Sequence, residues 1–348
     1  MQLLSLTASA DLTGLALMSK YFFTAALCML IVMTLAYLWY TIGSARLAKQ
    51  LAVEHVRNRS RSKVSKASED GGVTTLVRSD VVLHEQPDGE KPIALNRNLI
   101  TIGRIGTTLG WFVVFMLFMS QLFRAIVEQH APWSNLYEFS LSFTCALLLC
   151  YLIFEARFHE RVRAWGLYVC LLSLVTVGIA IYLGITYNMI NGSAQLIPAL
   201  QDKPILTVHV SMAIFAYALF SVSFGAALIV LAQGGEGQRL AWLPSAEAAD
   251  ELGYKAVIVG FPLLALTLIL GAYWANYAWG HYWSWDPKET SALVTWLIYA
   301  VYLHARGIRG WHGKRAAWLL TVGFAATLFT YYGVSFFVPS LHSYAVPT

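Results

Sequence analysis

Long apolar runs alternate with shorter polar segments along almost the whole chain. A helix needs about 20 apolar residues to cross a bilayer, and eight runs approach or exceed that length. The third and seventh are short for a span, so we expect them to tilt or to continue past these limits. This pattern predicts an all-α, polytopic membrane helix bundle with about eight transmembrane helices. The eight runs lie near residues 19–43, 107–127, 139–155, 164–186, 206–232, 253–274, 290–306 and 315–337.

The composition supports a membrane protein. Of the 348 residues, 57% are hydrophobic and only 12% are charged, whereas a soluble domain has about 25% charged residues. The net charge of +5 does not indicate nucleic acid as a partner, because the basic residues fall between the apolar runs. All four cysteines lie inside those runs and none forms a CxxC motif. Neither a redox dithiol nor a disulfide framework is therefore expected.

Lysine and arginine are concentrated in alternate connections, above all in residues 44–106. Because basic loops stay on the cytoplasmic side, both termini and the Trp-rich residues 273–289 are expected outside. Residues 50–95 are rich in Ser, Asp and Gly, which indicates a polar, flexible cytoplasmic loop with little core of its own. We expect one integral membrane domain over residues 1–348, with 44–106 as this loop.

Four tryptophans are crowded into one short stretch, WANYAWGHYWSWDPKE, with Tyr277 and Tyr282 between them and Tyr273 directly before it. Flat rings of this kind can cover a large planar ligand, and each aromatic pair adds about 0.5–1.5 kcal/mol beyond area burial. The alternative is an aromatic belt at the membrane interface, which needs fewer rings. The density favours a ligand platform. The four residues are Trp274, Trp279, Trp283 and Trp285.

The same stretch ends in a helix-start signature. Asp286 can cap the helix, Pro287 suits its first position, and Glu289 completes the spacing of a capping box. The aromatic platform is therefore expected to be fixed to a defined helix end.

Two histidines are expected on the same outer side as the tryptophans. His209 lies near the start of the fifth run, in LTVHVSM, and His342 follows the eighth run, in VPSLHSY. Neutral imidazole is a good iron ligand, so the pair beside an aromatic platform predicts a six-coordinate haem site. The alternative is two unrelated interfacial histidines bonded to backbone or water. Zinc fits less well, since no further ligands with suitable spacing are present.

A third histidine lies within a predicted span. His304 comes fourteen residues after Thr290, about 21 Å along a helix and thus in the inner half of a core about 30 Å thick. An ionisable group there is costly without a partner. It is either hydrogen-bonded to a neighbouring helix or an axial ligand whose mate comes from another polypeptide.

The motif WGHYWSWDPKET resembles the WWD signature of haem-handling membrane proteins of cytochrome c maturation. The longer run GAYWANYAWGHYWSWDPKETSALVTWLIYAVYLHAR, with HVSMAIFAYALF and SNLYEF, is similar to the CcsA (ResC) family of the cytochrome c synthase system. The resemblance covers most of residues 105–348 and does not include the 44–106 loop.

The resemblance implies a role for each matching position. His209 and His342 are then the outer axial ligands of haem b, and His304 lies on the route by which haem crosses the membrane. No catalytic residue is implied, and His281 is not a ligand position. The haem propionates have three candidate partners, Lys288, Lys203 and Arg124. The implied haem-binding set is His209, His342, His304, Trp274, Trp279, Trp283, Trp285 and Asp286.

The implied function is cytochrome c haem lyase (synthase) activity in the cell membrane, inner or plasma, with the active face outside the cytoplasm. The chain would form a complex with a ResB-type membrane protein and attach haem by thioether bonds to the CxxCH motif of apocytochrome c. A thiol-reducing, thioredoxin-like protein is a further implied partner. One alternative is a haem delivery or export protein that passes haem to a chaperone. Another is a transporter whose Trp-rich loop binds a different aromatic substrate.

Overall fold

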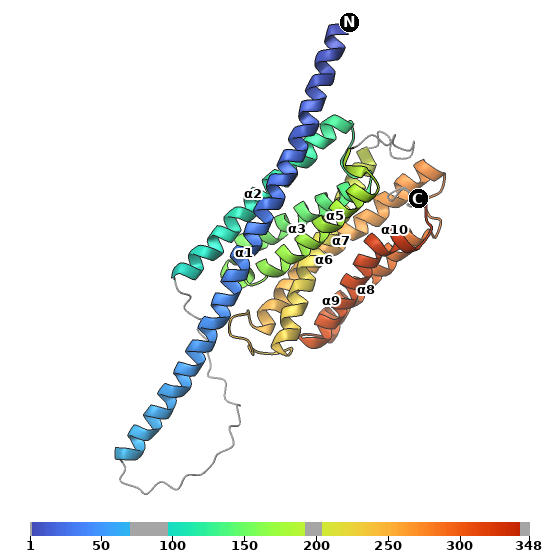
Figure 1. The fold of residues 1–348 in the computed structure, drawn as a ribbon. Coiled ribbons are helices and arrows are strands. Elements are labelled where there is room, and N and C mark those ends of the chain that lie inside the picture. Colours follow the sequence, from blue (N-terminus) through green and yellow to red (C-terminus); the bar gives the residue numbers. More distant parts are fainter. Residues whose placement is uncertain (1, 70–96, 192–203, 342–348) are drawn as a thin grey trace.

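The computed structural model describes residues 2–69, 97–191 and 204–341, and within these ranges the regular structure is entirely helical. The predicted all-α bundle is confirmed. Consecutive long helices run in opposite directions, so the α2–α3 and α7–α8 connections lie at one end of the bundle and the α8–α9 connection at the other (Figure 1). We call the first of these the loop end, defined by residues 129–135 and 280–286. The long helices in the described residues are α1 (Gln2–Glu69), α2 (Arg97–Glu128), α3 (Leu136–Phe158), α5 (Gly166–Thr186), α6 (Pro204–Gln233), α7 (Ala246–Trp279), α8 (Pro287–Arg309) and α9 (Lys314–Leu328).

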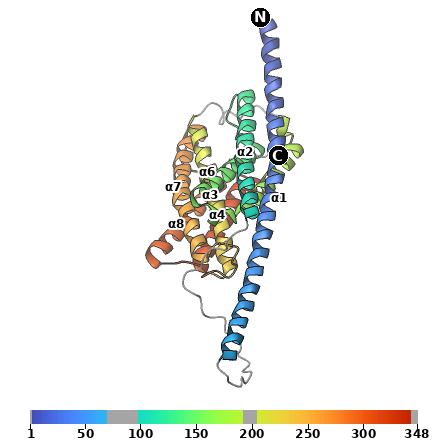
Figure 2. The same ribbon diagram turned by 90° about the vertical axis from the view of Figure 1, so that its left-hand side faces the viewer.

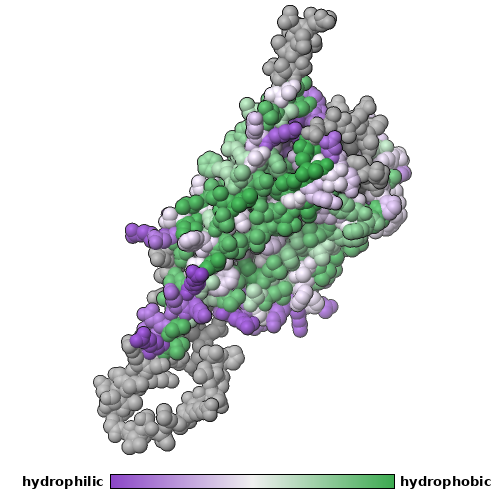
Figure 3. Space-filling view, in the orientation of Figure 1, coloured by the Kyte–Doolittle hydropathy of each residue, from purple (hydrophilic) through white to green (hydrophobic). Residues whose placement is uncertain are grey.

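A helix occupies each of the eight predicted spans, and seven described segments are long and apolar enough to cross a membrane. The last of these joins α9 to a π-helical turn, η3 (Phe329–Gly333), and to α10 (Val334–Phe337). Helix α8 is not among these seven segments, and charged residues lie in its first and last turns. Hydrophobic side chains cover the middle of the face in Figure 3, with hydrophilic ones towards its ends. The chain is a multi-pass membrane protein.

The polar segment predicted as a loop over residues 44–106 is helical at both ends. Helix α1 continues to Glu69 and α2 begins at Arg97, while residues 70–96 lie outside the described residues. The reason is local: no Gly or Pro occurs between residues 44 and 70, and the Ala, Leu, Lys and Arg that are common there favour helix. With 68 residues, α1 is about 100 Å long and projects beyond the bundle at both ends (Figures 1 and 2).

The predicted Trp-rich loop is also shorter than expected. Helix α7 includes residues 273–279 and ends at Gly280, whose φ of 82° is the left-handed conformation common at helix C-termini. The connection to α8 is therefore confined to residues 280–286.

Helix α6 forms the centre of the bundle, with α3, α5, α7 and α9 packed around it. Helices α1 and α2 form a pair that packs against α3 and α5. The two short connecting helices are α4 (Glu160–Arg163) and a 3₁₀ turn, η1 (Met189–Asn191). The pocket described next lies where α6 and α7 meet α3, α8 and η3 at the loop end.

Candidate functional site

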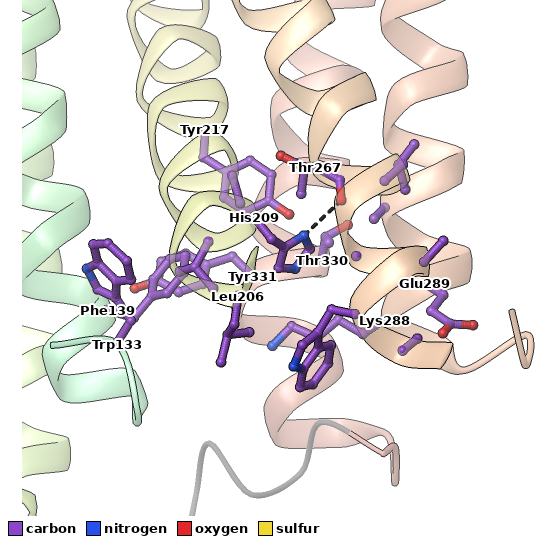
Figure 4. A pocket seen from close by; sticks show the side chains of 18 of the residues that line it. Trp133, Phe139, Leu206, His209, Tyr217, Thr267, Lys288, Glu289, Thr330 and Tyr331 are labelled. Atoms are coloured by element: carbon purple, nitrogen blue, oxygen red, sulfur yellow. Dashed lines mark hydrogen bonds between the residues drawn. The ribbon is translucent and has the colours of Figure 1, made fainter. Parts of the chain in front are cut away.

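A pocket opens at the loop end and encloses about 1060 Å³ of empty space, part of it open to solvent. Ligand sites commonly combine apolar walls with a few polar groups. Here the polar side chains include His209, Thr267, Lys288 and Glu289 (Figure 4). The aromatic walls and the few polar groups therefore suit a mostly apolar ligand. The aromatic lining residues are Trp133, Phe139, Tyr217, Trp274, Trp279, Trp283 and Tyr331.

His209 is held in the pocket in a single tautomer. Its Nδ1 lies 2.8 Å from the carbonyl oxygen of Thr267 on α7 (Figure 4). A carbonyl oxygen only accepts, so Nδ1 carries the hydrogen and donates it, and in the neutral ring the lone pair is on Nε2. Histidines that bind metals are commonly oriented in this way, with the second nitrogen donating to a carbonyl or carboxylate.

A glycine makes room for this imidazole. A Cβ on Gly271 would lie 2.6 Å from His209 Cε1, closer than real side chains approach. Thr267 and Gly271 are four residues apart and so lie on the same face of α7. This face therefore offers a backbone acceptor and, one turn later, a notch for the ring.

Three of the four expected tryptophans line the pocket. The indole of Trp274, only 2% exposed, is nearly parallel to the His209 ring, at 13° with centroids 6.5 Å apart. Trp279 meets Trp274 edge to face at 4.8 Å. Trp283 also faces the pocket, whereas Trp285 is 69% exposed and is not among the lining residues. The part of Trp285 in ligand binding stays a prediction.

The predicted capping box at the start of α8 is confirmed, and Asp286 has a second contact. Its Oδ2 accepts from the backbone N–H of Lys288 at 3.0 Å, and Glu289 Oε2 accepts from the N–H of Asp286 at 3.2 Å. The other oxygen, Oδ1, accepts from the N–H of Leu341 at 2.6 Å. Leu341 directly precedes His342, which lies outside the described residues. Asp286 therefore ties the chain next to His342 to the start of α8.

Arg124, one of three candidate propionate partners, is used elsewhere. It is 8% exposed, and its Nε donates to Glu138 Oε1 at 2.7 Å. Its two terminal nitrogens donate to the carbonyls of Ile190 at 2.9 Å and Met189 at 2.8 Å. Arg124 thus joins α2 to α3 and η1 and does not line the pocket.

Of the other two candidates, Lys203 lies outside the described residues. Lys288 lines the pocket, into which its side chain reaches from the first turn of α8 (Figure 4). Its Nζ donates to Ser335 Oγ at 3.3 Å.

His304 lies on the outer surface of α8, about 25 Å from Pro287 along the helix. Its side chain makes no hydrogen bond with any residue that the structure describes, so the alternative of a bond to a neighbouring helix is not seen there. Val301 and Ile308, three and four residues away on the same face, are exposed as well. His304 is therefore not part of the pocket lining, although α8 contributes residues to the pocket from its first turns.

Sequence reasoning missed several lining residues, among them Trp133, Phe139, Tyr217 and Tyr331. The first two belong to the segment PWSNLYEF, whose aromatic content could have signalled them. Tyr331 is placed by the π-helical turn η3, where its hydroxyl lies 2.7 Å from Ser140 Oγ. Such turns often mark functional sites, but the sequence carries no clear sign of one.

Comparison with known proteins assigns this multi-pass membrane bundle to a class. The family model described as Cytochrome C assembly protein matches residues 133–342, a range that begins at the pocket residue Trp133 and ends at His342. Cytochrome c biogenesis protein CcsA of Chlamydomonas reinhardtii is 31% identical over 347 residues, covering 92% of this chain and 95% of that protein. CcsA of Gloeobacter violaceus is 34% identical, with 71% and 88% covered, and CcsA of Prochlorococcus marinus is 34% identical, with 70% and 88% covered.

The chain therefore belongs to the CcsA family and takes part in cytochrome c biogenesis.

Proposed function

We propose that the pocket binds haem b and presents it, on the outer face of the cell membrane, for attachment to apocytochrome c. The observation that carries this proposal is the His209 Nδ1–H bond to the Thr267 carbonyl, which directs the lone pair to Nε2. Trp274, Trp279 and Trp283 supply flat surfaces next to that imidazole. The aromatic walls and the fixed tautomer both fit an iron porphyrin.

His342 supplies the second axial ligand in this proposal. Its support is the contact between Asp286 and Leu341, which holds the preceding residue beside the first turn of α8. That turn also carries the pocket residues Lys288 and Glu289. A short stretch of chain therefore suffices to bring the His342 imidazole to the pocket.

His304 marks the route by which haem crosses the membrane, and its mate lies on a ResB-type membrane protein. An imidazole on an apolar, outward helix face is costly in lipid unless it is paired. His304 has this position, next to exposed Val301 and Ile308. A partner helix that covers this face would remove the cost and could add the second ligand.

In this proposal, haem is attached at the loop end by an addition reaction between cysteine thiols and the haem vinyl groups. Each thiol of a CxxCH segment adds across one vinyl double bond: sulfur bonds to the inner carbon, hydrogen goes to the outer one, and a thioether forms without net oxidation. The histidine of the segment replaces one protein ligand on the iron. The pocket contributes position, and well-oriented reactants gain up to about 7–11 kcal/mol from proximity. A thioredoxin-like protein keeps the thiols reduced.

Co-expression with a ResB-type partner and an apocytochrome tests this reaction. We expect haem that stays on the cytochrome after denaturation and acid extraction, and none when the CxxCH cysteines are replaced by alanine. The alternative of a delivery protein, which has the same pocket, predicts bound but unattached haem under reducing conditions. The alternative of a transporter for another aromatic compound predicts no Soret band, even after haem is added to the purified chain.

A further inference from the structure

Two hydrogen-bond donors in the pocket wall have weak acceptors or none. Among the residues that the structure describes, the ammonium group of Lys288 donates only to Ser335 Oγ, at 3.3 Å. The Nε1 of Trp283 is shielded from solvent and has no hydrogen-bond partner among the described residues. Of the buried polar side-chain atoms without a partner in the described chain, this one alone belongs to a residue that lines the pocket. Buried donors normally find acceptors.

The carboxylates close to Lys288 are already engaged. Asp286 accepts backbone N–H groups on both oxygens, from Lys288 itself and from Leu341. Glu289 Oε2 accepts the N–H groups of Ser284, at 2.9 Å, and of Asp286. Among the described residues, Lys288 forms no ion pair with either.

The place of Lys288 in α8 is also unfavourable for a cation. It is the second residue of the helix, where the helix dipole is positive and an acidic side chain would be preferred. Departures from such local rules are expected at functional sites. A negatively charged ligand group beside Lys288 would relieve both the missing acceptor and the adverse dipole.

We propose that Lys288 binds a carboxylate of the ligand, with Trp283 Nε1 as a second donor; for haem this carboxylate is a propionate. The inference rests on the proposed function. The contact between Lys288 and a propionate would also orient the ligand, because the propionates and the vinyl groups occupy opposite edges of the porphyrin. The vinyl edge then points away from α8, towards the side of the pocket where Trp133 and Phe139 lie (Figure 4).

Comparing haem with its dimethyl ester tests the proposal, because the ester keeps the ring, the iron and the vinyls but has no carboxylate. Affinities are measured for the full purified chain by titration of the Soret band. We expect the natural chain to bind haem about ten- to a hundredfold more tightly than the ester, as a hydrogen bond to a charged group provides. Lys288→Met should lower the haem affinity towards that of the ester, because only the Trp283 donor remains, and leave the ester affinity unchanged.

Three further variants sharpen the result. Lys288→Arg should restore the preference for haem, and Trp283→Phe should weaken it while ester binding persists. Lys314→Met, at the first turn of α9 and outside the pocket, should have no effect. Equal affinities of the natural chain for haem and ester, or an unchanged preference in Lys288→Met, would overturn the inference while haem binding stands. Failure of the natural chain to bind either porphyrin would instead refute the proposed function.

Discussion

Gly271 and His209 are in contact across the α6–α7 interface, and the contact leaves no space for a methyl group. A Cβ at position 271 would lie 2.6 Å from His209 Cε1, and the neighbouring Nδ1 is held by the bond to the Thr267 carbonyl one turn earlier on α7. The imidazole therefore depends on a glycine four residues beyond its hydrogen-bond acceptor.

Gly271→Ala should displace the His209 ring and weaken haem binding about ten- to a hundredfold, since overpacking costs about 1–3 kcal/mol. Soret titration of the purified variant measures this loss, which added imidazole should partly reverse. Gly178→Ala is the matched control, because a Cβ at that helical glycine meets nothing within 4 Å. Equal haem affinities for the two variants would contradict the positioning role of Gly271.

Asp286→Asn should separate the helix cap from the contact to Leu341. Asn is as good an N-cap as Asp, but its single carbonyl oxygen cannot replace both Oδ2, which accepts from Lys288, and Oδ1, which accepts from Leu341. We expect nearly unchanged thermal stability and a roughly tenfold weaker haem affinity, because His342 loses its tether.

Ser245→Ala provides the comparison for Asp286. Ser245 caps the start of α7, the end of this helix that lies away from the pocket, by accepting from the N–H of Ala248. Its loss should lower the free energy of unfolding by about 0.5–2 kcal/mol without changing haem affinity. If Asp286→Asn behaves in the same way, Asp286 serves only as a cap.

His304→Ala should lower the amount of haem that copurifies with the complex of this chain and its ResB-type partner, because haem loses a ligand on its route. Val301→Ala, one turn earlier on the same exposed face, should leave the haem content unchanged. Haem content is measured by pyridine haemochrome absorbance. Full occupancy of the outer site in the His304→Ala complex would remove this residue from the route.

Arg124→Met should destabilise the bundle by about 3–5 kcal/mol, because it leaves the Glu138 carboxylate buried without its partner. The double variant with Glu138→Gln should recover part of this loss. Thermal unfolding in detergent measures both. A drop in haem affinity with unchanged thermal stability would instead place Arg124 in the binding site.

Much of the fold could be predicted because apolar runs of membrane length are a strong signal. The end of α1 could not be predicted in this way, because residues 44–69 are polar and yet helical. A polar sequence indicates exposure to water and does not by itself indicate that a helix ends. Helix α7 also ends later than its apolar run predicts, because aromatic residues up to Trp279 continue the helix until Gly280.

At the site, the capping box of Asp286 and Glu289 was predictable because its partners are three residues apart. The contact of Asp286 with Leu341 was not, since it joins residues 55 positions apart through a backbone N–H. The same holds for the Thr267 carbonyl that holds His209. Backbone acceptors carry no residue-type signature, so only a structure shows which one an imidazole uses.

The absorption spectrum of His209→Ala, purified with its natural partners, tests the central claim most directly. If His209 Nε2 ligates haem iron in the pocket, the variant should lose most of the Soret absorbance of the outer site, and free imidazole should restore part of it. A Soret band and reduced α-band identical to those of the natural complex would contradict the account.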